Sequence, residues 1–269
     1  MIFASDLDRT LIYSRRFIKE VEKDNIVPVE LYNEKIISYM TKQSLRLLQE
    51  ISSKAMFIPI TTRSIEQYSR ISIFDESISI KYAVTTNGGT ILIDKKLDTE
   101  WEDIVNRELK KCDSLEKVIE THKRMVKNPS ILRYRVADEK FFYNIIDLNS
   151  VNETCHDYYA EFDEYLEKAK WSKYDQGRKV YYVPNVLTKE KALMYIMKKE
   201  GIEKTIVSGD SIMDLSMLEI ASQGFVPLHG DLCDCLSDEH KKHINLMSEG
   251  FKGTEEILNI VKDICSKRL

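Results

Sequence analysis

The chain begins with Met1-Ile2-Phe3-Ala4-Ser5-Asp6-Leu7-Asp8-Arg9-Thr10, an apolar run that leads into two carboxylates and a hydroxyl. Side chains at positions i and i+2 of an extended chain point the same way, so we expect Asp6 and Asp8 to lie close together. Two carboxylates held this close repel each other unless a cation lies between them. The stretch therefore predicts a strand that ends in a magnesium site, with a carboxylate able to attack phosphorus. A surface turn is the alternative, because Asp and Thr are also common where strands end.

A second apolar strand, residues 56–61, supplies hydroxyl groups at its end. Thr61 and Thr62 close this strand, and Arg63 follows ahead of a helical segment. Such a strand end offers a hydroxyl and backbone N–H groups to a phosphate. The segment therefore favours a phosphate-binding group beside the first strand.

Two later segments add charged side chains. Lys189 stands at the start of a helical pattern, where it can supply a fixed positive charge. The strand 204–208 leads through Gly209 to Asp210 and Asp214, and their spacing allows both to share one face of the helix that begins there. The four segments together favour a site over a turn.

These segments resemble, in order, the four motifs of the haloacid dehalogenase (HAD) superfamily of phosphatases. The motifs are carried by Asp6-x-Asp8-x-Thr10, by Thr61 or Thr62, by Lys189, and by Gly209-Asp210-x-x-x-Asp214. Three further stretches, 82–91, 188–193 and 248–254, are similar to the Cof-like and sucrose-phosphatase-like branch (type IIB). The resemblance implies an α/β fold: a Rossmann-like parallel-sheet HAD core with an inserted α+β cap domain.

The resemblance also implies a catalytic role for four residues. Asp6 would be the nucleophile that forms an aspartyl-phosphate. Asp8 would protonate the leaving oxygen and then take a proton from the hydrolytic water. Thr61 would hydrogen-bond the transferring phosphoryl group, and Lys189 would neutralise its charge.

The metal in this resemblance is Mg²⁺. It would be held by Asp6, Asp210 and the backbone carbonyl of Asp8, with Asp214 near it or bound to it through water. Substrate contacts are expected from four residues: Arg9, Thr62, Arg63 and Asn87.

Two positions depart from the pattern of the branch. Arg9 stands where relatives usually carry Gly, and Met213 stands where Asn is usual. A long cation at position 9 either helps to hold an anionic substrate or points into water. Met213 removes one polar group from the surroundings of the metal. Neither change removes an acid that the chemistry needs.

Strands that alternate with helical patterns predict a parallel sheet, in which ligands bind outside the carboxyl ends of the strands. The expected core strands are 2–5, 56–61, 81–85 and 204–208, and Thr41 is expected to cap the helix that follows it. Residues 26–31 and 35–39 predict a hairpin, either a flap over the site or a structural excursion. The domains predicted are 1–86 for the first part of the core, 87–186 for the cap and 187–269 for the second part of the core.

The insert has its own pattern. It reads as amphipathic helix over 99–127, strands at 131–136 and 141–147, helix over 153–169 and a strand at 179–183. An antiparallel sheet with helices on one face is the simplest packing. Some cap side chains are candidate phosphate or sugar contacts, or else ordinary exposed residues: Arg133, Tyr134, Arg135, Lys173 and Arg178.

Composition excludes several classes of protein. No run of eighteen apolar residues occurs in the 269 residues, so no membrane span is expected, and the net charge of −4 disfavours a nucleic-acid binder. The odd count of 5 cysteines does not form a secreted disulfide framework, and with no leader pattern ahead of the first strand the sequence favours a cytoplasmic protein. The Cys and His residues between 229 and 243 do not have a standard zinc spacing.

The sequence therefore predicts a magnesium-dependent phosphatase, a phosphoric monoester hydrolase that acts on a small phosphorylated metabolite. A sugar phosphate is the first expectation, from the resemblance alone. A phosphomutase and a non-catalytic binder of a phosphorylated ligand are the alternatives. A homodimer is compatible with the sequence, and neither nucleic acid nor a membrane is expected as a partner.

Overall fold

The computed structural model describes residues 1–20, 23–150 and 159–267 and divides the chain into two compact units. The first unit comprises Met1–Asp98 and Lys189–Leu269, and the second comprises Thr99–Thr188. Residues 87–98, which the sequence assigns to the cap, lie in the first unit. The reason is that β6 (Thr90–Ile93) and β7 (Lys96–Leu97) continue the sheet begun by β5 (Tyr82–Thr85).

The first unit is built on a parallel sheet with strand order β14-β13-β12-β1-β4. Its strands are β1 (Ile2–Ser5), β4 (Met56–Pro59), β12 (Thr205–Ser208), β13 (Gln223–Pro227) and β14 (Ile244–Met247). Every residue of β1 and β12 is buried, as expected for central strands covered on both faces. The parallel sheet of the predicted HAD-type core is confirmed.

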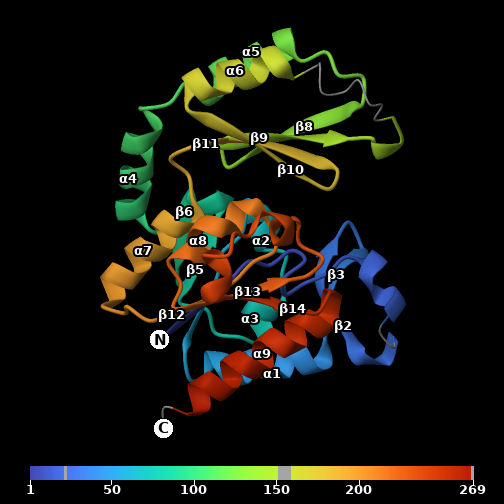
Figure 1. The fold of residues 1–269 in the computed structure, drawn as a ribbon, viewed down its shortest axis with the longest axis vertical. Coiled ribbons are helices and arrows are strands. Elements are labelled where there is room, and N and C mark those ends of the chain that lie inside the picture. The colour runs from blue at the N-terminus through green and yellow to red at the C-terminus, as the bar shows by residue number, and fades with distance from the viewer. Residues whose placement is uncertain (21–22, 151–158, 268–269) are drawn as a thin grey trace. The chain divides into compact units, whose positions relative to one another are not determined.

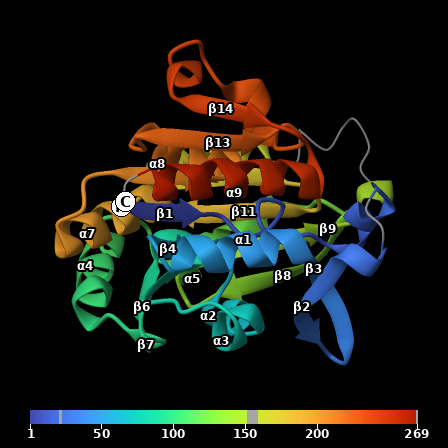
Figure 2. The ribbon, with the colours of Figure 1, turned by 90° about the horizontal axis from the view of Figure 1, so that it is seen from below.

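Helices α1 (Lys42–Ser52) and α9 (Gly250–Ser266) lie side by side over one face of this sheet (Figure 2). Thr41 caps α1 as predicted, since its side-chain oxygen accepts a hydrogen bond from the Ser44 N–H at 3.0 Å. The other helices of the unit are α2 (Ile65–Tyr68), α3 (Ile73–Glu76), α7 (Lys189–Glu200) and α8 (Leu215–Glu219). Short 3₁₀ turns occur at Arg15–Glu20, Lys23–Asn25, Thr86–Gly88, Ile212–Asp214, Asp231–Cys235 and His240–Lys242.

The predicted hairpin is formed by β2 (Ile26–Tyr32) and β3 (Lys35–Thr41). Asn33 and Glu34 connect the two strands with φ values of 48° and 62°. Two successive left-handed residues give the tight turn that suits the twist of a two-residue hairpin. The hairpin carries Glu30 and Ser38, both buried, so it contributes polar side chains to the interior of the unit.

The second unit is an antiparallel sheet with strand order β10-β11-β9-β8. Its elements are α4 (Thr99–Leu109), α5 (Leu115–Met125), β8 (Ile131–Ala137), β9 (Phe141–Ile146), α6 (Ala160–Ala169), β10 (Trp171–Gln176) and β11 (Lys179–Pro184), with a 3₁₀ turn at Leu148–Ser150. Helices α5 and α6 contact each other and lie over one face of the sheet (Figure 1). The predicted α+β insert is therefore confirmed as a fold.

The details of this unit differ from the pattern in three places: two concern its helices, and the third is the strand β10, which the pattern does not predict. The helical stretch predicted over 99–127 is two helices, because Ser114 caps a second helix by accepting a hydrogen bond from the Lys117 N–H. The helix predicted over 153–169 is present from Ala160, and residues 153–158 lie outside the described residues.

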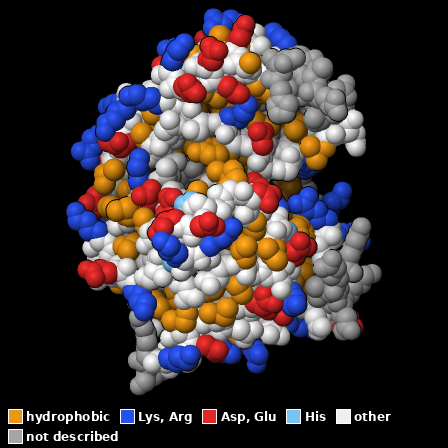
Figure 3. All heavy atoms as spheres, viewed as in Figure 1, with side chains coloured by type: hydrophobic (Ala, Val, Ile, Leu, Met, Phe, Trp, Pro, Cys, Tyr) orange, Lys and Arg blue, Asp and Glu red, His pale blue; other side chains and the backbone are white. Residues whose placement is uncertain are grey.

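The surface carries charges of both signs. Lys and Arg side chains alternate with Asp and Glu side chains over the face drawn in Figure 3. Among the described residues, none of the helices combines the length and the apolar character that crossing a bilayer requires.

Candidate active site

Asp6 lies directly after β1, at the carboxyl end of the central strand. Because β12 and β4 pair with β1 on either side, the side chain projects where all three strands end. The Asp6 N–H donates to the Ser208 carbonyl at 2.9 Å and thereby extends the ladder by one residue. The carboxylate is only 5% exposed, and burial raises the pKa of Asp6 to about 7.

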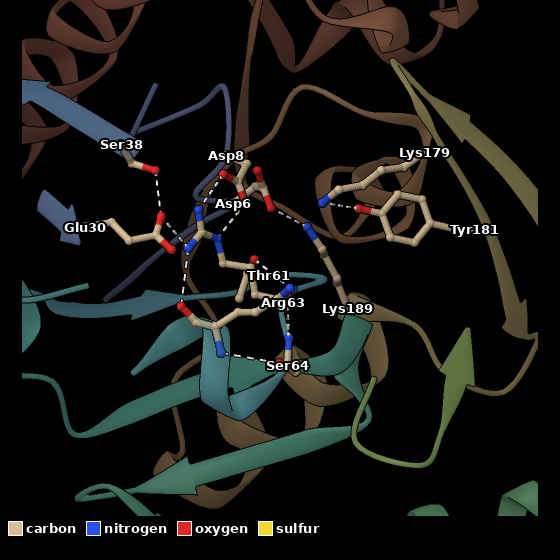
Figure 4. A network of polar contacts seen from close by, with 11 residues as sticks. Asp6, Asp8, Glu30, Ser38, Thr61, Arg63, Ser64, Lys179, Tyr181 and Lys189 are labelled. Atoms are coloured by element: carbon tan, nitrogen blue, oxygen red, sulfur yellow. Dashed lines mark hydrogen bonds and ion pairs between the residues drawn. The ribbon is translucent and has the colours of Figure 1, made fainter. Parts of the chain in front are cut away.

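Lys189, the first residue of α7, places its ammonium group between two carboxylates. Its Nζ donates to Asp6 Oδ1 at 2.6 Å and to Asp214 Oδ1 at 2.5 Å, and the side chain is 1% exposed (Figure 4 shows the contact with Asp6). Burial alone would lower the pKa of Lys189, but the charges of Asp214 and Asp6 outweigh it and raise the pKa. Lys189 is thus a fixed buried cation in contact with Asp6.

Asp214 is held by the turn that follows β12. Its Oδ2 accepts hydrogen bonds from the Asp210 N–H, the Ser211 N–H and the Ser211 hydroxyl at 3.0, 2.9 and 3.0 Å. Gly209 makes room for this arrangement, since a Cβ there would lie 2.5 Å from the Asp214 Cβ. Both oxygens of Asp214 are therefore engaged within the protein.

Asp210 is bonded quite differently. It is completely buried, yet among the described residues neither of its carboxylate oxygens has a hydrogen-bond donor. Within the same residues its ion-pair partner is Arg9, whose Nε lies 3.3 Å from Asp210 Oδ2. Burial and the neighbouring charges of Asp6 and Asp214 raise the pKa of Asp210 well above its ordinary value. A buried carboxylate in this state calls for a cation.

The donor set fits a hard divalent metal. One oxygen from each of Asp6, Asp210 and Asp214 lies within 4.8 Å of the others, and in the described part of the chain this is the group of side chains suited to an ion. A cation beside Asp6 and Asp210 would favour their ionised forms. The side chain of Asp8 is not part of this group, because it is turned toward Arg63.

Arg9 lies inside the site and not on a water-facing arm. It adopts φ 64°, the left-handed conformation in which glycine has no penalty. The guanidinium Nη2 donates to the His229 carbonyl at 2.5 Å, and the His229 ring contacts the Arg9 carbonyl at 2.8 Å through Nε2. Glycine would adopt this local backbone without strain, and the Arg9 side chain lies beside Asp210.

Arg63 makes a bidentate pair with Asp8. Nε and Nη2 of Arg63 each donate to one oxygen of Asp8 at 2.7 Å, as drawn in Figure 4. Nη1 lies 2.9 Å from Glu30 Oε2, which also accepts from the Ser38 hydroxyl at 2.6 Å. Sequence reasoning missed Glu30 and Ser38, although a buried acid on the predicted hairpin needs a cation. The Asp8 side chain remains 44% exposed.

Thr61 is buried beside this network. Its N–H donates to the Val84 carbonyl at 2.9 Å, and its hydroxyl accepts from the Arg63 N–H at 3.2 Å. Asn87, also buried, donates its N–H to the Thr61 carbonyl at 3.0 Å and has φ 53°. Thr62 is half-buried. The structure therefore brings Thr61, Arg63 and Asn87 into one backbone-linked group.

The segment with Cys and His residues makes other contacts. The Cys233 thiol donates to the Pro227 carbonyl, and His240 lies 3.1 Å from Glu219. Asp231, which sequence reasoning also missed, is half-buried, and one of its oxygens has no donor among the described residues. Burial raises its pKa.

The cap candidates lie in the second unit. Arg133, Tyr134 and Arg135 are exposed on β8, and Lys173 lies 2.5 Å from Asp163. In the antiparallel register of β8 and β9, Arg135 lies opposite Tyr143.

Comparison with known proteins identifies one family. The model of the sucrose-6F-phosphate phosphohydrolase family matches residues 1–248. No curated protein matches the chain.

Solved structures share the fold at low sequence identity. A sucrose-phosphatase from Synechocystis, in complex with sucrose and phosphate, is 15% identical with a TM-score of 0.68, covering 97% of both chains. A trehalose-6-phosphate phosphatase related protein is 12% identical with a TM-score of 0.59, covering 100% of both chains. A haloacid dehalogenase-like hydrolase from Bacillus subtilis is 18% identical with a TM-score of 0.55, covering 98% of this chain and 91% of the other.

The chain belongs to the sucrose-6F-phosphate phosphohydrolase family of HAD-type phosphatases and is a phosphoric monoester hydrolase. The predicted family, fold class and enzyme class are confirmed.

Proposed function

We propose that this member of the family hydrolyses a small sugar phosphate through an aspartyl-phosphate formed on Asp6. The observation that carries the proposal is the setting of Asp6: a buried carboxylate at a strand end, in contact with the cation Lys189 and close to Asp210, whose carboxylate has no hydrogen-bond donor among the described residues. Such a group is oriented and shielded from water, as a nucleophile in phosphoryl transfer requires.

The proposed reaction has two steps. A carboxylate oxygen of Asp6 bonds to phosphorus while the bond from phosphorus to the sugar oxygen breaks, and Asp8 gives a proton to that oxygen. Water then attacks phosphorus and gives a proton to Asp8, while the bond from phosphorus to the Asp6 oxygen breaks. This step releases inorganic phosphate and restores the Asp6 carboxylate. The partial exposure of Asp8 supports this role, because its carboxyl can reach a leaving group that arrives from solvent.

Other residues would hold the phosphoryl group. Thr61 would donate its hydroxyl to a phosphoryl oxygen, and Lys189 would neutralise charge that develops there. Thr62, Arg63 and Asn87 are proposed as further substrate contacts, because they adjoin Thr61 in the chain or through its backbone carbonyl.

Mg²⁺ is the proposed metal, since it prefers oxygen ligands and keeps several waters. Asp6 and Asp210 would hold it with the backbone carbonyl of Asp8, and Asp214 would contact it through water because its own oxygens are engaged. When bound, the ion offsets the repulsion between the attacking carboxylate and the phosphate oxygens.

The substrate class is proposed from the relatives. The family that matches takes its name from the hydrolysis of sucrose-6F-phosphate, and the similar Synechocystis enzyme is a sucrose-phosphatase. We therefore expect a phosphorylated sugar as the substrate.

Phosphate release from a panel of sugar phosphates tests the proposal. We expect release that depends on Mg²⁺ and falls about 1,000-fold or more in Asp6→Asn, because the nucleophile is lost. Asp94→Asn, an exposed acid of the same unit, is the matched control and should keep full activity.

Two results would contradict the proposal. Isomerised sugar phosphate with little free phosphate would favour a phosphomutase, and binding without any turnover would favour a non-catalytic binder. Trapping of ³²P on the wild-type chain but not on Asp6→Asn would separate the covalent route from direct attack by water.

A further inference from the structure

We propose that Arg9 is a built-in cation that occupies Asp210 until the metal binds, so that metal binding displaces its guanidinium. The inference rests on the proposed metal site of the phosphatase. It concerns a residue that this chain carries in place of the usual Gly, and it predicts how tightly this site holds a metal.

Arg9 contacts Asp210 directly. Asp210 is fully buried, and in the described residues the cation within ion-pair distance is Arg9, with Nε 3.3 Å from Oδ2. The Arg9 side chain is 22% exposed, so a solvent-connected cation neutralises a buried acid. A divalent ion held by Asp210 would bind the carboxylate that this guanidinium contacts.

The pair of Arg9 and Asp210 is incomplete. Arg9 Nε and both oxygens of Asp210 have no hydrogen-bond partner among the described residues, although they form an ion pair. Charge-assisted hydrogen bonds are roughly twice as strong as neutral ones, and this ion pair forms none among the described residues. The contact is therefore weak enough for a metal to replace, unlike the bidentate pair that Arg63 makes with Asp8.

Contacts with His229 hold Arg9 in place. Its Nη2 donates to the His229 carbonyl, while Nε2 of His229 contacts the Arg9 carbonyl. Nδ1 of His229 accepts from the Gly250 N–H at 3.0 Å, so Nε2 carries the proton and donates to Arg9. The rings of Tyr13 and Phe17 pack against His229. The backbone of Arg9 and one end of its guanidinium are thus anchored by His229, while Nε, which faces Asp210, has no hydrogen-bond partner among the described residues.

A consequence follows for substrate. Once turned from Asp210, the guanidinium keeps its charge and its planar set of donors, which suit a phosphate. Metal and phosphate should then each strengthen the binding of the other, because binding free energies couple reciprocally.

The test is calorimetric titration of Mn²⁺ and Mg²⁺ into the full chain, with and without inorganic phosphate. Arg9→Gly suits the left-handed backbone, and Arg9→Asn is a second variant that tolerates it. Both should bind the metal about tenfold more tightly than wild type, since a competing charge is gone. Arg16→Ala removes an exposed arginine and should leave affinity unchanged, whereas Asp210→Asn should abolish binding. Phosphate should tighten metal binding in wild type, and it should do so less in the Arg9 variants.

Unchanged or weaker metal binding in both Arg9 variants would overturn the inference while leaving the proposed phosphatase intact. If wild type and both variants bind no metal, the inference and the proposed metal site fail together. Metal binding that appears only in the Arg9 variants would support the inference in its strongest form.

Discussion

The two units bury polar side chains in different ways. In the first unit, the cation Lys189 lies between the carboxylates of Asp6 and Asp214, all of them nearly inaccessible to water. In the second unit, the centre holds a neutral pair, in which Asn144 Nδ2 lies 2.9 Å from His122 Nε2. The rings around this pair are those of Phe142, Phe162 and Tyr182.

The difference separates chemistry from packing. Buried ion pairs add little net stability compared with apolar side chains of the same volume, because desolvation is expensive. A neutral polar pair costs much less to bury and still specifies how side chains fit. The charges of the first unit are therefore best explained by reactivity, and the pair in the second by the arrangement of its aromatic core.

The largest expected effect comes from removing the cation of the first unit. Lys189→Met leaves Asp6 and Asp214 buried without a counter-charge, so we expect a loss of about 3–5 kcal/mol in the free energy of unfolding. Urea unfolding followed by far-UV circular dichroism measures this loss. Lys189→Met/Asp214→Asn, which removes one of the two charges, should recover part of it. Equal stability of the double and single variants would contradict the electrostatic explanation.

Removing Arg63, which pairs with Glu30 and Asp8, should also lower the free energy of unfolding, by a smaller amount. Arg63→Met leaves Glu30 buried with only the Ser38 hydroxyl as a donor among its described contacts, while Asp8 can turn to solvent. We expect a loss of about 2–3 kcal/mol in unfolding free energy.

Glu30→Gln is the compensating change for this variant. Added to Arg63→Met, it removes the unpaired charge and should restore about 1 kcal/mol or more. Added to wild type, it should destabilise instead, so a double-mutant cycle gives the coupling energy. A coupling near zero would mean that the Arg63–Glu30 contact contributes nothing to stability.

Local patterns in the sequence predicted most of the fold. Short buried runs such as Ile2–Ser5 and Thr205–Ser208 are the most regular signals of a parallel sheet, and Thr41 has the side chain that a helix cap needs. The strands at 171–176, 223–227 and 244–247 were missed. Residues 171–176 include Ser, Lys, Asp and Gln, so tertiary pairing and not apolar character makes them a strand.

The site was predictable where a motif stands at a strand end. Asp6, Asp210 and Asp214 follow such ends, and the structure gathers their oxygens. Glu30 and His229 could not be found in this way, because each acts through a partner far away in the chain. Their positions depend on how the hairpin and the loop after β13 pack, which no local pattern encodes.

The smallest effect is expected in the second unit and depends on pH. Burial lowers the pKa of His122 to about 4, whereas an unfolded histidine titrates near 6.5. As the pH falls below 6.5 the unfolded state binds the proton first, and the folded state binds none until about pH 4. The free energy of unfolding therefore falls as the pH drops from about 6.5 to about 4, and at pH 5 it is about 2 kcal/mol lower than at neutral pH.

Tryptophan fluorescence can isolate this effect, because the 2 tryptophans of the chain, Trp101 and Trp171, both lie in the second unit. Urea unfolding at pH 7.5 and at pH 5 should differ by the stated amount in wild type. His122→Gln can still bond Asn144 but has no proton to gain, so its two curves should lie closer together by about 2 kcal/mol. If His122→Gln loses as much stability at pH 5 as wild type does, protonation of His122 is not the cause of that loss. The contrast between a neutral buried pair in the second unit and buried charges in the first would then be unsupported.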